Sequence, residues 1–230
     1  MTAQKTIGIL AGMGPRSTAP FIDLVVTQCQ IQYGAKLDEE FPHMMIYSLP
    51  TPFYVDVPID HDKMKLVVKI GLKRLEETGV SFIAIPCNTV HAYFDDLEAS
   101  VGVRLLNIIE ESMREIQDRK KIALIATRST VGSRAYQQYI ERGNAATIHS
   151  EFIQETVDAL ITDVMAGKAC EQLYSDWVTL INQICDAGAD SAIIACTDLS
   201  EFAKINYSNI EITDSSLALA KAVVSAYLRL

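Results

Sequence analysis

One unit of sequence occurs twice in the chain, and this repeat restricts the possible folds more than any other feature. A helix, a glycine, a buried strand, a cysteine and a polar pair follow one another in "LKRLEETGVSFIAIPCNT" and again in "INQICDAGADSAIIACTD". Gly79 precedes Cys87 by the same number of residues as Gly188 precedes Cys196. The openings of the two halves, "KTIGILAGMGPRST" and "KKIALIATRST", also correspond. Because chance would have to produce the pattern twice, we expect two structurally similar domains related by duplication.

Strands and helices are predicted to alternate along the whole chain. Buried apolar runs predict strands, among them "TIGILAG", "HMMIYSLP", "VSFIAIP", "KKIALIAT", "TIHSEFI" and "ADSAIIA". Apolar residues at helical spacing predict helices between them, including "VGSRAYQQYIERG", "CEQLYSDWVTLINQICDAG" and the closing "SSLALAKAVVSAYLRL". Strands that alternate with helices of this length predict parallel βαβ units whose sheets are covered on both faces.

The predicted fold is therefore α/β, with two similar three-layer domains, mainly parallel sheets and a pseudo-two-fold relation between them. We place the boundary near residues 118–120, which assigns 1–118 to the first domain and 119–211 to the second. The last segment, 212–230, is predicted to pack back on the first domain. A cleft between the domains is the expected place for an active site.

Composition narrows the classes of partner. The net charge of −9 argues against nucleic acid, because phosphate backbones are bound by positive surfaces. No apolar run approaches the length of a membrane span, and "MTAQKTIGIL" lacks the pattern of a secretory signal, so we expect a cytoplasmic protein without membrane contact. Five cysteines without a CxxC pair or a Cys/His pattern predict reduced thiols and no metal site.

Cys87 and Cys196 are the candidate reactive residues. Each directly follows a predicted strand, and ligands of parallel sheets bind beyond the carboxyl ends of the strands. Each also stands just before a predicted helix, whose free N–H groups and dipole are expected to lower the pKa of a thiol. Cys29, Cys170 and Cys185 fall within predicted helices and are expected to be structural.

Two thiols on opposite sides of a cleft are suited to racemisation. One, as a thiolate, can remove a proton from one face of a carbon acid while the other, as a thiol, returns a proton to the opposite face. Neutral donors must then hold the substrate carboxylate and stabilise the charge that builds toward an enolate. Asn88, Thr89, Thr197 and the backbone of "AGMGP" are placed to do so, and no cofactor is needed.

Three motifs carry a family resemblance. In order and over essentially the whole chain, "GILAGMGPRST", "PCNTVH" and "ACTDLSEF" resemble the aspartate/glutamate racemase family of cofactor-independent, two-cysteine amino-acid racemases. The resemblance implies two α/β domains around a cleft, a small amino-acid substrate and a homodimer. It implies site residues as follows: Cys87 and Cys196 as the acid/base pair, Asn88, Thr89 and Thr197 as carboxylate binders, and Met13 and Gly14 as part of the substrate loop.

The departures from the family pattern concern the substrate. Asp198 stands where the family usually has glutamate, and Ala11 stands where it usually has glycine. Aspartate racemases resembling this chain hold the side-chain carboxylate with an arginine after the second strand and a lysine before a later helix. Here "SLPTPFYVDVP" has no basic residue, and "IQETVDAL" offers Gln154 and Glu155 instead of a lysine.

Unless Arg16, Arg128 or Arg134 takes their place, an acidic substrate lacks a partner for its distal carboxylate. Specificity for aspartate or glutamate is therefore an open point. A related reaction at the same two cysteines, such as maleate isomerisation or hydantoin racemisation, remains an alternative, as does a protein that only binds its ligand.

Three further residue patterns have simpler interpretations. His91 could activate Cys87 as a nucleophile, but Ser200 stands at the matching place in the second repeat, which favours a structural imidazole. Asp214 is expected to cap the last helix. The glycines of "GILAGMGP" do not have the G-x-G-x-x-G spacing of a dinucleotide site.

Overall fold

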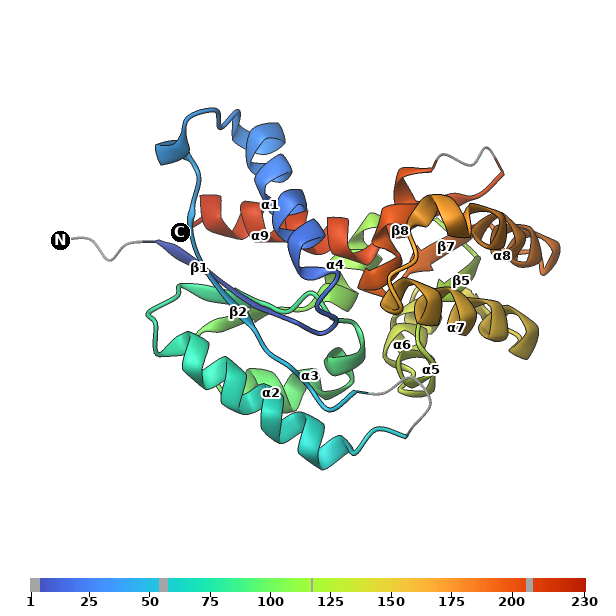
Figure 1. Cartoon of the computed structure of the whole chain (residues 1–230), viewed down its shortest axis with the longest axis horizontal. Helices are drawn as coiled ribbons and strands as arrows, with labels where there is room; N and C mark the ends of the chain where they lie inside the picture. Colours follow the sequence, from blue (N-terminus) through green and yellow to red (C-terminus); the bar gives the residue numbers. More distant parts are fainter. Residues whose placement is uncertain (1–4, 54–57, 117, 206–208) are drawn as a thin grey trace.

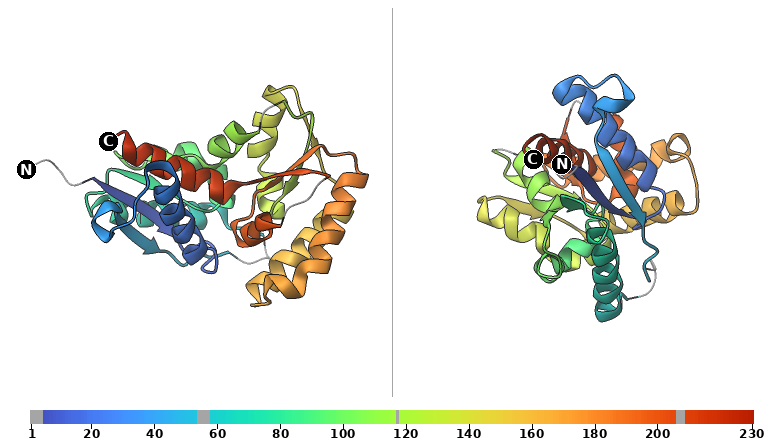
Figure 2. Two further views of the ribbon diagram at one scale, coloured as in Figure 1. Left: turned by 90° about the horizontal axis from the view of Figure 1, so that it is seen from above. Right: turned by 90° about the vertical axis from the view of Figure 1, so that its left-hand side faces the viewer.

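Two parallel sheets, each covered by helices, make up the protein. The computed structural model describes residues 5–53, 58–116, 118–205 and 209–230. The sheets have four strands each, in the order β2-β1-β3-β4 and β6-β5-β7-β8. They lie one after the other along the long axis of the molecule (Figure 1), and the left view in Figure 2 shows the same two-part arrangement from above. Every described strand pair is parallel, so the α/β prediction is confirmed.

The first half contains the first sheet and the helices between its strands. Its strands are β1 (Thr6–Ala11), β2 (His43–Ser48), β3 (Phe82–Ala84) and β4 (Arg104–Leu106). Its helices are α1 (Thr18–Tyr33), α2 (His61–Glu76), α3 (Phe94–Glu98) and α4 (Ile108–Glu115), with short 3₁₀ helices η1 (Asp38–Glu40) and η2 (Thr89–Tyr93).

The second half repeats this order. Its strands are β5 (Lys121–Ile125), β6 (Ala146–Ile148), β7 (Ser191–Ile194) and β8 (Glu211–Asp214). Its helices are α5 (Arg128–Gly132), α6 (Ala135–Arg142), α7 (Glu151–Met165), α8 (Tyr174–Asp186) and α9 (Ser215–Leu228), with 3₁₀ helices η3 (Cys170–Leu173) and η4 (Thr197–Lys204).

Two element predictions were wrong in the second half, and a third helix, predicted over "CEQLYSDWVTLINQICDAG", begins as the 3₁₀ helix η3 before α8. The strand predicted over "TIHSEFI" ends at Ile148, because Ser150 caps α7 by accepting the Ile153 N–H. The single helix predicted over "VGSRAYQQYIERG" is two helices, because Arg134 adopts a left-handed conformation with φ 57° between α5 and α6. Both errors come from local backbone conformation that apolar spacing does not report.

Both sheets are the middle layer of a three-layer half. In β1, Ile9 packs with Phe21 of α1, whereas the next residue, Leu10, packs on the other face with Val68 of α2. Successive strand residues point to opposite faces, so a strand covered on both sides must be apolar at every position. The second sheet follows the same rule, with α6 on one face and α7 and α8 on the other.

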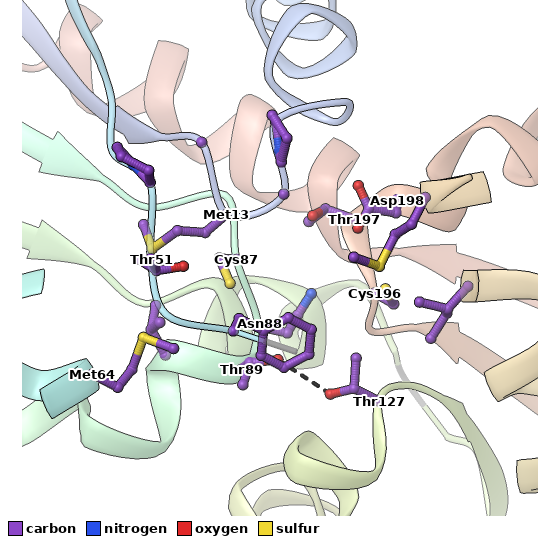
Figure 3. Close-up of a pocket in the computed structure, with 18 of the residues that line it drawn as sticks. Met13, Thr51, Met64, Cys87, Asn88, Thr89, Thr127, Cys196, Thr197 and Asp198 are labelled. Carbon is purple, nitrogen blue, oxygen red and sulfur yellow. Dashed lines mark hydrogen bonds between the residues drawn. The ribbon is translucent and has the colours of Figure 1, made fainter. Parts of the chain in front are cut away.

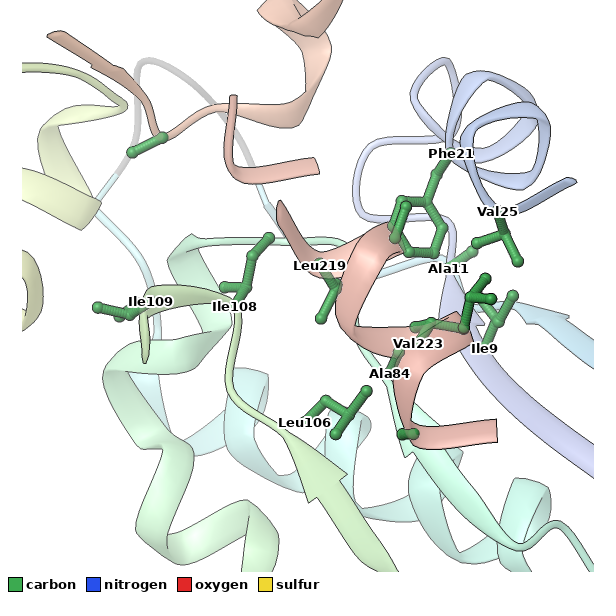
Figure 4. Packing of buried hydrophobic residues seen from close by; sticks show 14 of the residues in the cluster. Ile9, Ala11, Phe21, Val25, Ala84, Leu106, Ile108, Ile109, Leu219 and Val223 are labelled. Atoms are coloured by element: carbon green, nitrogen blue, oxygen red, sulfur yellow. The ribbon is translucent and has the colours of Figure 1, made fainter. Parts of the chain in front are cut away.

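Helix α9 joins the two halves. It begins directly after β8 of the second sheet and packs against α1 and α4 of the first half (Figure 1). Leu219 and Val223 of α9 belong to one buried cluster with Ile9 and Ala84 (Figure 4). Each fully buried leucine, valine or isoleucine side chain of this cluster contributes about 1.5–3 kcal/mol to stability. Because the same cluster extends to Leu124 of the second sheet, the two halves share part of their core.

The return of the chain to the first half begins after Asp214, since residues 211–214 pair with β7 in the second sheet. The predicted domain boundaries and the pseudo-two-fold relation stay predictions. Within the described residues, no helix combines the length and the apolar character that a membrane span needs.

Candidate active site

A pocket of about 330 Å³ is lined by both halves of the molecule (Figure 3). Its walls come from the segments that follow β1, β2, β3, β5 and β7, together with side chains of α2 and α7. In each sheet the first strand of the half lies between the second and the third, which is the arrangement that opens a crevice at the carboxyl ends of the strands. Both crevices contribute to this one pocket.

All seven residues that the sequence suggested for the site line this pocket, namely Met13, Gly14, Cys87, Asn88, Thr89, Cys196 and Thr197. They come from three segments, which follow β1, β3 and β7. Their catalytic and binding roles stay a prediction.

The two cysteines occupy equivalent places and different surroundings. Cys87 follows β3 and is half-buried, whereas Cys196 follows β7 and is 7% exposed. Figure 3 shows them on opposite sides of the pocket. All five cysteines of the chain are free thiols.

Burial dominates the acidity of both thiols. It raises the pKa of Cys87 to about 11, although the N–H groups of Val90 and Thr89 lower it. The pKa of Cys196 is raised well above its usual range, first by burial and then by the charge of Asp198. The expected N–H groups are present at the starts of η2 and η4, but the predicted net lowering of the pKa was wrong because desolvation outweighs them.

Asn88 is held by side chains that are distant in the sequence. Its Oδ1 accepts a hydrogen bond from the Tyr136 hydroxyl at 2.6 Å, and its Nδ2 donates to Ser215 Oγ at 2.9 Å. Asn88 is only 4% exposed, and Tyr136 is fully buried. A side-chain amide has two N–H donors, so this network fixes the group and uses only one of them.

Hydroxyl groups join the cysteine segments of the two halves. Thr89 Oγ1 lies 3.1 Å from the hydroxyls of both Thr127 and Thr130, which belong to the second half. In the reciprocal contact, the Thr197 hydroxyl donates to Ser17 Oγ of the first half at 3.2 Å. Each cysteine segment is therefore braced against the segment that follows the opening strand of the other half.

His91 supports the main chain beside Cys87. Its Nδ1 lies 2.7 Å from the Cys87 carbonyl oxygen, and Ile108 N–H donates to its Nε2 at 3.3 Å. Burial lowers the pKa of this imidazole to about 4. These contacts are with backbone atoms, as the structural interpretation expected.

Asp214 caps α9 as predicted, because it accepts hydrogen bonds from the N–H groups of Ser216 and Leu217. Its Oδ1 also accepts from the Ser200 hydroxyl at 2.8 Å. Burial raises the pKa of this carboxyl group to about 6.

Positive side chains are absent from the described residues that line the pocket. Arg128 forms ion pairs with Glu151 and Asp158 of α7, and Arg134 pairs with Glu141. Two of the three arginines considered as substitutes are thus engaged elsewhere.

The third, Arg16, is exposed and lies against the turn at Gly167, outside the pocket lining. Gln154 donates to the Ala126 carbonyl and to Asp158 and is buried. Residues 54–57 of the segment "SLPTPFYVDVP" lie outside the described residues.

Sequence reasoning missed most of the apolar wall of the pocket. This wall consists of Met13, Phe53, Met64, Ile161 and Met165. Only Met13 lies in a motif, and the other four come from a loop and two helices whose packing no local pattern reports. Asp198 also lines the pocket; the sequence places it in the repeated polar pair after Cys196 and shows it as a departure from the family pattern, without assigning it a site role. Among the described residues, no three His, Cys, Asp or Glu side chains gather into a metal-binding group.

Comparison with known proteins agrees with this geometry. The family model described as "Asp/Glu/Hydantoin racemase" matches residues 10–223. The chain belongs to this racemase family. It is 46% identical over 223 residues to the "Broad specificity amino-acid racemase RacX" of Bacillus subtilis (strain 168), a match that covers 96% of this chain and 98% of that protein.

Solved structures of racemases share the fold. Aspartate racemase of Picrophilus torridus superposes with a TM-score of 0.82 at 25% identity, covering 97% of this chain and 94% of the other. An aspartate racemase homologue from Pyrococcus horikoshii OT3 has a TM-score of 0.77 at 22% identity, covering 98% of this chain and 100% of that chain. This member of the racemase family therefore has the family's two α/β domains over essentially its whole length.

Proposed function

We propose that this chain is a cofactor-independent amino-acid racemase that interconverts L and D enantiomers by proton transfer between Cys87 and Cys196. The observation that carries the proposal is the presence of these two thiols on opposite sides of one pocket, each at the end of an equivalent strand. The high identity to a protein named as a broad-specificity amino-acid racemase supports it.

In the proposed reaction, the thiolate of one cysteine removes the proton from Cα, and the thiol of the other donates a proton to the opposite face. A pKa of about 11 makes the Cys87 thiolate a minor species at neutral pH but a stronger base once formed. Each pKa unit corresponds to about 1.4 kcal/mol. Asn88 supplies its unused N–H to the substrate carboxylate, where negative charge increases in the transition state. The hydroxyls of Thr89 and Thr197 become further neutral donors by turning from Thr127 and Ser17 toward the ligand.

We propose amino acids with neutral side chains as the preferred substrates. The apolar wall provides contact area, and methionine side chains adapt to ligands of different shape. A second carboxylate on the substrate would find no cation among the described lining residues. Aspartate and glutamate are accordingly expected to be poorer substrates than methionine or leucine.

A second candidate is a related reaction at the same two cysteines, such as hydantoin racemisation or maleate isomerisation. The description of the matching family includes hydantoin racemases, and the largely apolar pocket suits an uncharged ring.

We also propose a cytoplasmic homodimer. Its support is the exposed pair Met45 and Ile46, 41% and 45% exposed, on edge strand β2.

The test is exchange and inversion at Cα in D₂O, followed by NMR and chiral chromatography. The panel contains methionine, leucine, aspartate, glutamate, a substituted hydantoin and maleate. We expect exchange with the neutral amino acids, and loss of it when Cys87→Ala and Cys196→Ala are combined. Cys185→Ala, in helix α8, is the matched control and should retain activity. If the double variant exchanges as fast as the unaltered protein, the proposal is wrong.

A further inference from the structure

Asp198 has an unusual position for a charged residue. It follows Cys196 by two positions, lines the same pocket as both cysteines, and lies on the Cys196 side in Figure 3. Among the described residues that line the pocket it is the only one with an ionisable carboxyl group. The pocket therefore presents one negative side chain and no described positive one.

One oxygen of this carboxyl group lacks a partner. Asp198 Oδ1 is buried and accepts no hydrogen bond within the described part of the chain. Buried polar atoms in native proteins nearly always have a partner, and an unpaired carboxylate oxygen costs more than a neutral one. Burial raises the pKa of Asp198, while Ser17 and the charge of Arg16 lower it. A donor that approaches from the pocket would satisfy the free oxygen.

Gly14 makes room for the carboxyl group beside the pocket. A Cβ atom at this position would lie 3.0 Å from Asp198 Oδ2 and 3.1 Å from Oδ1, closer than side chains normally pack. A residue larger than glycine at this position would crowd the Asp198 carboxyl group. The glycine allows a carboxylate from the second half to reach the wall formed by the first half.

We propose that Asp198 accepts the α-ammonium group of the substrate. The inference rests on the proposed racemase function, because an amino acid carries this ammonium group on the same carbon whose proton moves between the two thiols. The acceptor must therefore lie beside both cysteines. Asp198 does so, since it lines the same pocket as Cys87 and Cys196 and follows Cys196 by two residues.

This assignment narrows the expected class of substrate. Maleate and hydantoins carry no ammonium group, so Asp198 favours free amino acids over both. The same contact connects substrate binding with the acidity of the two thiols. The charge of Asp198 raises the pKa of both thiols, and an ammonium group paired with that carboxylate offsets the effect, which favours the thiolate once an amino acid is bound.

The test compares two ligands that differ only in the ammonium group, L-methionine and 4-(methylsulfanyl)butanoate, by isothermal titration calorimetry. A charge-assisted hydrogen bond should make the unaltered protein bind L-methionine about tenfold or more tightly than the deaminated acid. Asp198→Asn should reduce the ratio to within about threefold. Asp198→Glu keeps the charge and should retain the preference. Asp186→Asn, an exposed aspartate at the end of α8, should leave the ratio unchanged.

An unchanged ratio in Asp198→Asn would overturn the proposal, as would equal affinity of the two ligands, or no binding of L-methionine, in the unaltered protein. Loss of the preference in Asp198→Glu would also contradict it. The racemase function is judged separately, by deuterium exchange over the amino-acid panel. Exchange together with an unchanged binding ratio would remove Asp198 as the ammonium acceptor and leave the two-cysteine reaction intact.

Discussion

The two halves of the molecule support their cysteine segments in different ways. His91 and Ser200 occupy matching places, each four residues after a cysteine. His91 joins the Cys87 carbonyl to the N–H of Ile108 at the start of α4. Ser200 instead donates to Asp214, which caps α9. In both halves the segment after the cysteine is tied to the helix that follows the last strand of the sheet.

The difference teaches that the duplicated fold fixes the place of a contact but not its chemistry. Burial opposes charge in both halves, so it lowers the pKa of His91 to about 4 and raises the pKa of Asp214 to about 6. His91 is charged when protonated and Asp214 is charged when deprotonated. Burial therefore makes the stability contribution of His91 rise with pH and that of Asp214 fall with pH.

The largest expected effect concerns His91. Its folded pKa of about 4 lies below its usual value of 6.5, so its contribution is present above pH 6.5 and is lost as the pH falls toward 4. That shift corresponds to about 3 kcal/mol of unfolding free energy. Asp214→Asn removes the carboxyl group that opposes His91, so urea unfolding of this variant should show stability rising from pH 4 to 6.5. A flat or falling curve would contradict this account.

Asp214 should give the opposite slope. Its folded pKa of about 6 lies above its usual value of 3.8, so its contribution is present below pH 3.8 and is lost as the pH rises toward 6. The loss is about 3 kcal/mol. In His91→Gln, where the imidazole is removed, urea unfolding should show stability falling between pH 4 and 6. If unfolding free energy changed with pH in the same direction in Asp214→Asn and His91→Gln, the proposed difference between the two halves would be wrong.

A smaller effect is expected for Tyr136→Phe, which tests the first-half residue Asn88. The change leaves the buried Asn88 Oδ1 without its donor and should cost about 1–3 kcal/mol of stability. Because Asn88 is proposed to hold the substrate carboxylate, KM should rise more than kcat falls. Tyr139→Phe is the control, since that hydroxyl donates to Glu110 on a half-buried surface and away from the pocket. Equal KM values in the two variants would show that Tyr136 does not position Asn88.

The sequence contained enough to predict the parallel sheets and to name residues that come together in one pocket. The repeat located Cys87 and Cys196 at the ends of equivalent strands, because the carboxyl end of a parallel strand is set by local pattern and topology. It did not predict the acidity of the thiols. The helix N–H groups are a local feature, whereas the burial that outweighs them depends on the packing of both halves.

Contacts between distant segments could not be predicted either, because they also depend on how the two halves pack. Tyr136 and Ser215 reach Asn88 from helices far along the chain, and no spacing rule relates the three residues. The unpaired oxygen of Asp198 likewise becomes visible only when the glycine segment after β1 is brought beside it.

The central claim is that Cys87 and Cys196 act on opposite faces of one substrate carbon. Its most direct test is Cα deuterium exchange with each methionine enantiomer separately, in Cys87→Ser and in Cys196→Ser. Each variant retains one base, which can remove and return a proton on its own face only. We therefore expect one variant to exchange L-methionine and the other to exchange D-methionine, neither with inversion. Exchange of the same enantiomer by both variants, or inversion by either, would contradict the claim.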